Sequence, residues 1–108
     1  MYPYGYSNAM YQIVETKAFS RWLRSIKDQK TRFRLVKRLR RATLGNLGDV
    51  RSVGDSVFEM REFFGPGWRM YYVQRNHVLI VMLGGGDKST QERDIERAKA
   101  LAQEIPDE

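Results

Sequence analysis

Four side chains in the second half of the chain have the chemistry needed to act on a phosphodiester. They are Arg61, Arg69, Tyr71 and Lys88. Arginine pairs bidentately with phosphate and stabilises the charge that builds on it in a transition state. Tyrosine can stack on a base or donate a proton, and RNA brings its own nucleophile, the 2′-OH. These residues could cleave RNA without a metal or a protein nucleophile if they meet on one surface.

The alternation of side chains along the predicted strands brings these residues together. In the stretch VFEMRE, Phe58 and Met60 share one face and Arg61 lies on the other. If the apolar pair faces the helices, Arg61 lies on the open face, and the next strand places Arg69 and Tyr71 beside it. The lysine follows directly after the last strand. In the competing interpretation, Arg61 pairs with Glu59 or Glu62, and Arg69 only decorates a solvated strand.

Two amphipathic helices are predicted in the first half of the chain. Thr16 can cap a helix whose apolar residues recur at helical spacing, at Phe19, Trp22, Leu23 and Ile26. A second helix is predicted from about residue 30 to residue 44, where Gly45 is a natural stop. Its expected apolar residues are Phe33, Leu35, Val36, Leu39 and Ala42. The short break between the two helices predicts an antiparallel helical hairpin.

A short strand over residues 11–15 precedes the helices, and three strand candidates follow them. These candidates cover residues 50–53 continuing into 57–63, then 68–74 and 77–83. Their short connections require antiparallel neighbours, and the doubly apolar VLIVML is expected inside the sheet. A third helix follows, begun by an S-x-x-E capping box at Ser89 and Glu92. The sequence therefore predicts an α+β domain of order β-α-α-β-β-β-α, an antiparallel meander with helices packed on one face.

The stretch GGGDKST before the third helix has the layout of a phosphate-binding loop, but not its spacing. The motif G-x-x-x-x-G-K-[ST] needs glycines where this chain has Met82 and Asp87. We therefore expect the three glycines to end a buried strand and Ser89 to cap the helix that follows.

The composition excludes several classes of protein. At 108 residues the chain is long enough for one domain. It has no cysteine, which excludes a disulfide scaffold and a thiolate metal site. Its single histidine excludes a histidine-rich metal site. No apolar run approaches the roughly 20 residues that span a bilayer, and no signal-peptide pattern is present, so a cytoplasmic location is expected. Ser7-Asn8-Ala9 before Met10 resembles a cloning remnant, so residues 1–9 are expected to be irregular and residues 10–108 to form the domain.

Positive charge is concentrated in one segment. The net charge is +6, and KTRFRLVKRLRR, residues 30–41, holds seven basic residues and no acid. Such a block indicates a polyanion such as nucleic acid, although a solvated helix face or a surface for an acidic partner protein fits equally well. His77, Asp94 and Glu96 are expected to be exposed, with no set of acids that would form a metal site.

Several ordered motifs make the chain resemble a known family. They are G-N-x-G-D at residues 45–49, E-M-R at 59–61, G-P-G-W-R at 65–69, and G-G-D-K-S-x-Q-x-x-D-I-x-x-A at 85–98. This set resembles the toxins of type II toxin–antitoxin modules, of the RelE/ParE superfamily, in the phage-derived, HigB-like branch called addiction module killer proteins. The resemblance covers essentially residues 10–105 and implies the RelE/ParE-like fold.

The resemblance also implies an activity. RelE-like and HigB-like toxins cut mRNA in the ribosomal A site without a metal or other cofactor, and so inhibit translation. By position in the motifs, Arg61 and Arg69 would hold and neutralise the scissile phosphate. Lys88 would stabilise developing charge or act in proton transfer, and Tyr71 would stack on or orient a base. Many RelE-type toxins carry a functional tyrosine or histidine in the C-terminal segment, and this chain has neither after Lys88.

The resemblance further implies partners. The basic helix would dock on ribosomal RNA through exposed charges, at Arg34, Lys37, Arg38 and Arg41. The same charges could receive an acidic antitoxin, and the usual partner in the family is a small helix-turn-helix antitoxin. Two other functions stay open: a ParE-like inhibitor of DNA gyrase that needs no catalytic set, and a non-catalytic, nucleic-acid-binding toxin remnant.

Overall fold

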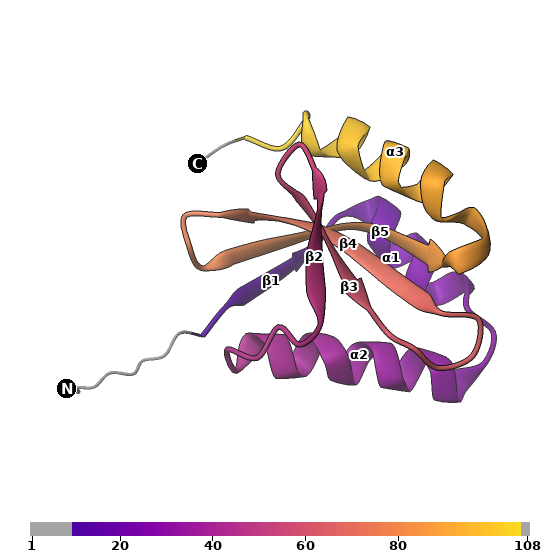
Figure 1. The fold of residues 1–108 in the computed structure, drawn as a ribbon. Coiled ribbons are helices and arrows are strands. Elements are labelled where there is room, and N and C mark those ends of the chain that lie inside the picture. Colours follow the sequence, from indigo (N-terminus) through magenta and orange to yellow (C-terminus); the bar gives the residue numbers. More distant parts are fainter. Residues whose placement is uncertain (1–9, 107–108) are drawn as a thin grey trace.

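A short strand, a helical hairpin, four consecutive strands and a last helix follow one another along the chain (Figure 1). The computed structural model describes residues 10–106, so the prediction for residues 1–9 lies outside the described residues. The elements are β1 (Gln12–Glu15), α1 (Lys17–Ser25), α2 (Gln29–Thr43), β2 (Val50–Gly54), β3 (Val57–Arg61), β4 (Trp68–Arg75), β5 (Leu79–Asp87), a 3-10 turn (Lys88–Thr90) and α3 (Gln91–Ala102). The predicted α+β class is confirmed.

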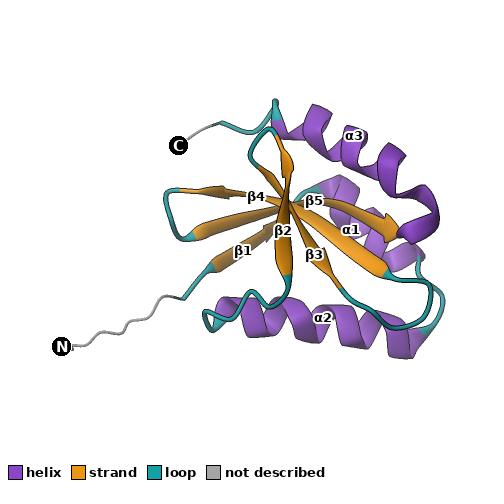
Figure 2. Ribbon diagram, in the orientation of Figure 1, coloured by secondary structure: helices purple, strands orange, loops and turns teal. Residues whose placement is uncertain are grey.

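The five strands form one mixed sheet in the order β1-β5-β4-β3-β2 (Figure 2). Strands β2 to β5 form the antiparallel meander that their short connections predicted. Strand β1 instead pairs in parallel with β5, so the prediction of an antiparallel sheet holds only for the other four strands. Strand β5 lies between β1 and β4, which confirms the interior position predicted for VLIVML.

The segment 50–63 forms two strands, so the prediction of one continuous candidate is wrong. A tight turn at Asp55 and Ser56 separates β2 from β3, and both residues have positive φ angles of 55° and 64°. Two successive left-handed residues are what a type I′ hairpin requires. The observed order is therefore β-α-α-β-β-β-β-α, with one strand more than predicted.

The helical hairpin covers one face of the sheet. The Thr16 hydroxyl accepts a hydrogen bond from the Phe19 amide, which confirms the predicted cap. A first hydrophobic core lies between the hairpin and the sheet. It is formed by residues of both: Phe19, Ile26, Leu35, Leu39, Ala42, Met60, Met70, Tyr72, Ile80 and Met82. Phe33 and Val36 do not belong to this core, so their prediction as buried residues is wrong. At about 100° per residue, Phe33 and Leu35 point to opposite sides of α2, and only Leu35 can face the sheet.

The opposite face of the sheet is covered by α3, and the expectation that all helices pack on one face is wrong (Figure 1). Figure 1 shows α3 and α2 on opposite sides of the sheet. A second core lies beneath α3, formed by Val57, Tyr71, Val73, Val81, Leu83, Ala98 and Ala102. Strands β4 and β5 are apolar on both faces, and burying both faces needs a cover on each side.

The three glycines lie inside β5 and do not end it, which corrects the prediction. A Cβ atom at Gly85 would lie 2.5 Å from the Trp22 ring, and one at Gly86 would lie 1.9 Å from an oxygen of Asp94. Glycine therefore lets α1 and α3 approach the strand closely from its two sides. The capping box is also corrected, because the Asp87 carboxylate accepts hydrogen bonds from the Ser89 amide and hydroxyl.

No helix in residues 10–106 is long and apolar enough to cross a membrane.

Replacing Gly86 with alanine should lower the free energy of unfolding by about 2 kcal/mol, because the added methyl group would overlap the Asp94 carboxylate. Gly84→Ala is the matched control, since a Cβ atom there meets nothing within 4 Å. It should change stability by no more than about 0.5 kcal/mol. Urea denaturation of both variants measures the difference, and equal stabilities would contradict the close approach of α3.

Candidate functional site

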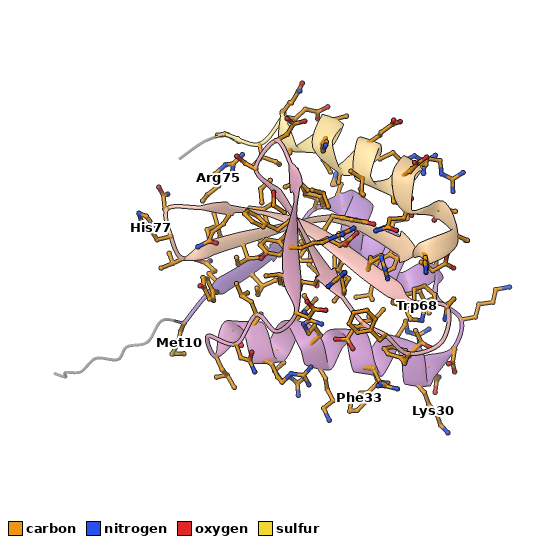
Figure 3. The ribbon with its side chains drawn as sticks, in the orientation of Figure 1. Met10, Lys30, Phe33, Trp68, Arg75 and His77 are labelled. Carbon is orange, nitrogen blue, oxygen red and sulfur yellow. The ribbon has the colours of Figure 1, made fainter. Side chains whose placement is uncertain are left out.

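Three of the predicted cations meet where β3 ends and β4 begins. Arg61 and Arg69 are direct partners in the β3–β4 register, so their side chains leave the sheet on the same face. Lys88 follows β5, whose last residue, Asp87, pairs with Trp68 at the same end of β4. Figure 3 labels Trp68 at this end of the sheet. We call Arg61, Arg69 and Lys88 the cationic corner.

The loop between β3 and β4 brings Arg69 and Lys88 to the same point. A Cβ atom on Gly67 would lie 3.2 Å from Nη1 of Arg69 and 3.5 Å from Cβ of Lys88. The Lys88 amide also donates a 3.4 Å hydrogen bond to the Pro66 carbonyl. Gly67 has a φ of 84°, in the left-handed region that favours glycine, and a Cβ atom there would crowd the Arg69 guanidinium. The G-P-G turn therefore lies against both Arg69 and Lys88.

Two like charges placed opposite each other in a sheet repel, and here each has its own carboxylate. Arg61 pairs with Asp49, with 3.3 Å between Nη2 and Oδ1, and its side chain is 27% exposed. Arg69 lies 3.7 Å from the Glu59 carboxylate, donates to the Gly67 carbonyl, and is only 8% exposed. Arg69 thus lies beneath the surface, and the expectation that it sits on an open face is wrong. Lys88 is exposed.

Glu59 is a residue whose role the sequence did not predict, because it pairs with Arg69 and not with Arg61. Its side chain has no exposed surface, yet it accepts hydrogen bonds from Arg51 of β2 at 3.1 Å and from Gln91 of α3 at 2.8 Å. With Arg69 it forms a buried network that joins β2, β3, β4 and α3. The sequence signals were the E-M-R motif and the alternation that puts Glu59 on the same strand face as Arg61 and Tyr71.

Tyr71 does not lie on an open surface, and its predicted role in stacking on a base is wrong. Its side chain is fully buried beneath α3. Burial raises the pKa of its hydroxyl well above the usual value, and the carboxylates of Glu59 and Asp94 add to the shift. The hydroxyl makes no hydrogen bond of good geometry with the described residues. Tyr71 therefore keeps its proton and does not meet a substrate directly.

Arg38 is not an exposed docking charge, which corrects another prediction. It is 3% exposed and donates hydrogen bonds to three backbone carbonyls, those of Leu47 at 2.9 Å, Asp49 at 2.7 Å and Arg61 at 2.8 Å. It also pairs with the Glu62 carboxylate. The G-N-x-G-D loop wraps around this guanidinium, so Arg38 holds the end of β3, where Arg61 lies.

The other three predicted docking charges are exposed on α2. The Arg34 guanidinium lies 3.8 Å from the centre of the Phe64 ring, beside the G-P-G turn. Arg41 lies two turns further along the same flank of the helix, and Lys37 lies between them. Positive charge therefore continues from the cationic corner onto the neighbouring flank of α2.

The remaining predictions concern single polar residues. His77 and Glu96 are exposed, as predicted. Asp94 is only 9% exposed, so its predicted exposure is wrong. Its carboxylate accepts a hydrogen bond from the Thr90 hydroxyl and packs against Gly86. Within residues 10–106, no three histidine, cysteine, aspartate or glutamate side chains are grouped as metal ligands.

The chain is 45% identical over 94 residues to an uncharacterized protein of Haemophilus influenzae, a match that spans 87% of this chain and 95% of the relative. No protein-family model matches, and no solved structure matches.

Arg38→Ala should lower the free energy of unfolding by about 3 kcal/mol or more, because it leaves Glu62 and three carbonyls without their buried partner. Lys37→Ala removes the same charge from an exposed position and should cost no more than about 0.5 kcal/mol. Chemical denaturation of the two variants gives both values. A small effect of Arg38→Ala would refute its role as an anchor.

The protein should lose stability above pH 10. Burial raises the pKa of Tyr72 to about 12 from its usual 10.0, and that of Tyr71 also rises. The folded state thus holds protons that the unfolded state releases, so stability is complete below pH 10 and falls as the pH rises toward 12. Urea unfolding at several pH values measures the fall, which Tyr72→Phe should reduce. An unchanged stability up to pH 12 would contradict the burial of these phenols.

Proposed function

The chain belongs to the same family as the Haemophilus influenzae protein, and we propose that it is a toxin of a type II toxin–antitoxin module. In this proposal it is a HigB-like member of the RelE/ParE superfamily that cleaves mRNA on the ribosome in the cytoplasm and so inhibits translation. The observation that supports the proposal most is the cationic corner, where Arg61 and Arg69 are cross-strand partners and Lys88 joins them over Gly67.

The proposed reaction uses the RNA's own hydroxyl. The 2′-hydroxyl loses its proton to water, and its oxygen attacks the adjacent phosphorus. The bond from phosphorus to the 5′-oxygen breaks, and this oxygen takes up a proton from water. A 2′,3′-cyclic phosphate and a 5′-hydroxyl result. The half-buried Arg61 and the exposed Lys88 bind the phosphate and stabilise the charge that builds on its oxygens. Arg69 lies beneath them and adds positive potential from a fixed position. Because Tyr71 is buried, it does not contact the RNA in this reaction.

The exposed charges of α2 suit the ribosome. Arg34, Lys37 and Arg41 extend the positive surface away from the corner, and RNA phosphates bind such a surface with release of counterions. Arg38 is not part of this surface, because it is buried in the anchor described above. A helix-turn-helix antitoxin is the proposed partner that neutralises the protein.

One observation favours a second function, inhibition of DNA gyrase on the same fold. The burial of Tyr71 and the pairing of Arg69 with Glu59 leave a smaller set of exposed catalytic side chains than the motifs implied. A gyrase inhibitor or a non-catalytic toxin remnant needs no such set. The supercoiling of a plasmid by purified gyrase, measured with and without the protein, distinguishes a gyrase inhibitor from a ribonuclease and from a non-catalytic remnant.

Lys88→Ala and Arg61→Gln should each reduce mRNA cleavage at least tenfold, because each removes a charge that faces the phosphate. The measurement is primer extension on an mRNA that is being translated in a reconstituted system. Arg69→Ala is a poorer test, since it would leave the buried Glu59 with less compensating charge and so weaken the fold.

Lys17→Ala is the matched control, because Lys17 is an exposed lysine of α1 outside the cationic corner. It should leave the cleavage rate within about twofold of the original, since surface substitutions away from special features are nearly neutral. Cleavage that depends on ribosomes and is lost only in the corner variants would support the proposal. Intact mRNA with the folded original protein would refute it.

A further inference from the structure

A hollow of about 410 Å³ lies beside the last part of β5, between α1 and α3. Figure 1 shows these two helices on either side of the end of β5. The volume is within the range of about 300–1,000 Å³ that is typical of small-molecule sites. The walls are mostly apolar and include Trp22 of α1, Leu83 of β5, and Ala98 and Leu101 of α3. Neither α2 nor the cationic corner contributes a residue to this hollow.

Gly84, in the wall of the hollow, is a glycine that no contact within the described chain requires. Its neighbours Gly85 and Gly86 make room for packed side chains, whereas a Cβ atom on Gly84 would meet nothing within 4 Å. Its φ angle is not positive either, so its backbone conformation does not require glycine. A glycine inside a strand weakens the strand and often marks a place where a ligand approaches the backbone closely. The open space at Gly84 is therefore suited to a bound molecule.

The hollow also contains a buried carboxylate, that of Asp94. This residue is only 9% exposed, and the Thr90 hydroxyl donates a hydrogen bond to its Oδ2 at 2.5 Å. Within residues 10–106, no cation forms an ion pair with it. Its place in the first turn of α3 stabilises the negative charge in part. A carboxylate taken this far out of water is fully compensated only by a cation, which a ligand could supply.

The charge of the hollow favours a cationic ligand. Its two other charged residues, Arg97 and Glu104, are exposed and have opposite signs. Two carboxylates and one guanidinium leave one net negative charge there, although the whole chain carries +6. The indole of Trp22 adds to the attraction, because the face of an aromatic ring attracts a cation. The apolar walls require that the rest of the ligand be hydrocarbon.

We propose that the hollow between α1 and α3 binds a small organic amine in its ammonium form, with an aromatic ring as its apolar part. The ammonium donates hydrogen bonds to Asp94. The ring lies on the backbone of Gly84, where no side chain intervenes, and contacts Trp22 and Leu101. This inference goes beyond the proposed ribonuclease activity and does not depend on it.

Two other occupants fit less well. An aromatic carboxylate could meet Arg97, but it would bring a second negative charge to the buried Asp94. An extended peptide could pair with the edge of β5, because β1 pairs only with residues 79–82 and leaves residues 83–87 without a neighbour on that side. Main-chain pairing alone would supply no cation for Asp94.

The test is calorimetric titration of the folded protein with 2-phenylethylamine and with 2-phenylethanol, which has the same ring but a hydroxyl in place of the ammonium. The amine should bind one-to-one with a Kd of about 1 mM or below. The alcohol should bind at least tenfold more weakly. Asp94→Asn should raise the Kd of the amine at least tenfold, because it removes the charge that pairs with the ammonium. Asp55→Asn is the matched control, since Asp55 is an exposed acid outside the hollow, and it should change the Kd less than twofold.

Gly84→Val is a second variant that does not touch Asp94. Its Cβ atom would meet no atom of the protein, so the fold should be retained, but its side chain would occupy the space of the ring. It should therefore raise the Kd of the amine at least tenfold. Amide NMR shifts caused by the amine should centre on Gly84 and Ala98.

Several results would each overturn the proposal: no binding at about 10 mM amine, equal binding of the amine and the alcohol, an unchanged Kd in the Asp94 and Gly84 variants, or shifts centred on Arg61 and Lys88. Tighter binding of phenylacetate would assign the hollow to an anion. Tighter binding of a tripeptide whose only amine is a lysine side chain would assign it to a partner protein. Because no mRNA cleavage is measured, these results hold whether or not the protein is a ribonuclease.

Discussion

A carboxylate without exposed surface is tolerated only where cations and hydrogen-bond donors surround it, and Glu59 is placed in this way. Arg51, Arg69 and Gln91 reach it from β2, β4 and α3. The same network therefore closes α3 over the sheet and fixes Arg69 below the surface. Of the three cations of the corner, the half-buried Arg61 and the exposed Lys88 are the two that a substrate could reach. The arrangement of the cationic corner therefore depends on the cations and donors that surround the buried Glu59 carboxylate.

Helix α2 has three different flanks because its side chains repeat every 3.6 residues. One side carries Leu35 and Leu39 into the core. The flank beside the G-P-G turn carries Arg34, next to the buried Arg38 that holds the end of β3. The flank beside α1 carries Val36, which is 36% exposed. A charged helix that looks uniform in sequence thus supports the fold and the cationic corner and leaves its third flank exposed.

Alternation along the strands was enough to predict that Arg61 and Arg69 are neighbours, because direct cross-strand partners follow from the hairpin connection. It was not enough to predict whether their face is open, since that depends on where α3 packs. The doubly apolar pattern of β4 and β5 was the available signal that both faces are covered. Nothing local distinguishes Arg38 from Arg34: its burial depends on carbonyls of residues 47, 49 and 61, which only the tertiary fold brings to it. The RelE/ParE-like fold and the activity that the resemblance implies both stay predictions.

We propose that the cationic corner promotes attack by an RNA 2′-hydroxyl. The most direct measurement is cleavage of a ribosome-bound mRNA in which a single 2′-deoxynucleotide replaces the ribonucleotide on the 5′ side of the mapped cut. The all-RNA message should yield a 2′,3′-cyclic phosphate and a 5′-hydroxyl, and the substituted message should stay intact at that site. Cleavage of the substituted message at an equal rate, or of neither message by the folded protein, would contradict it.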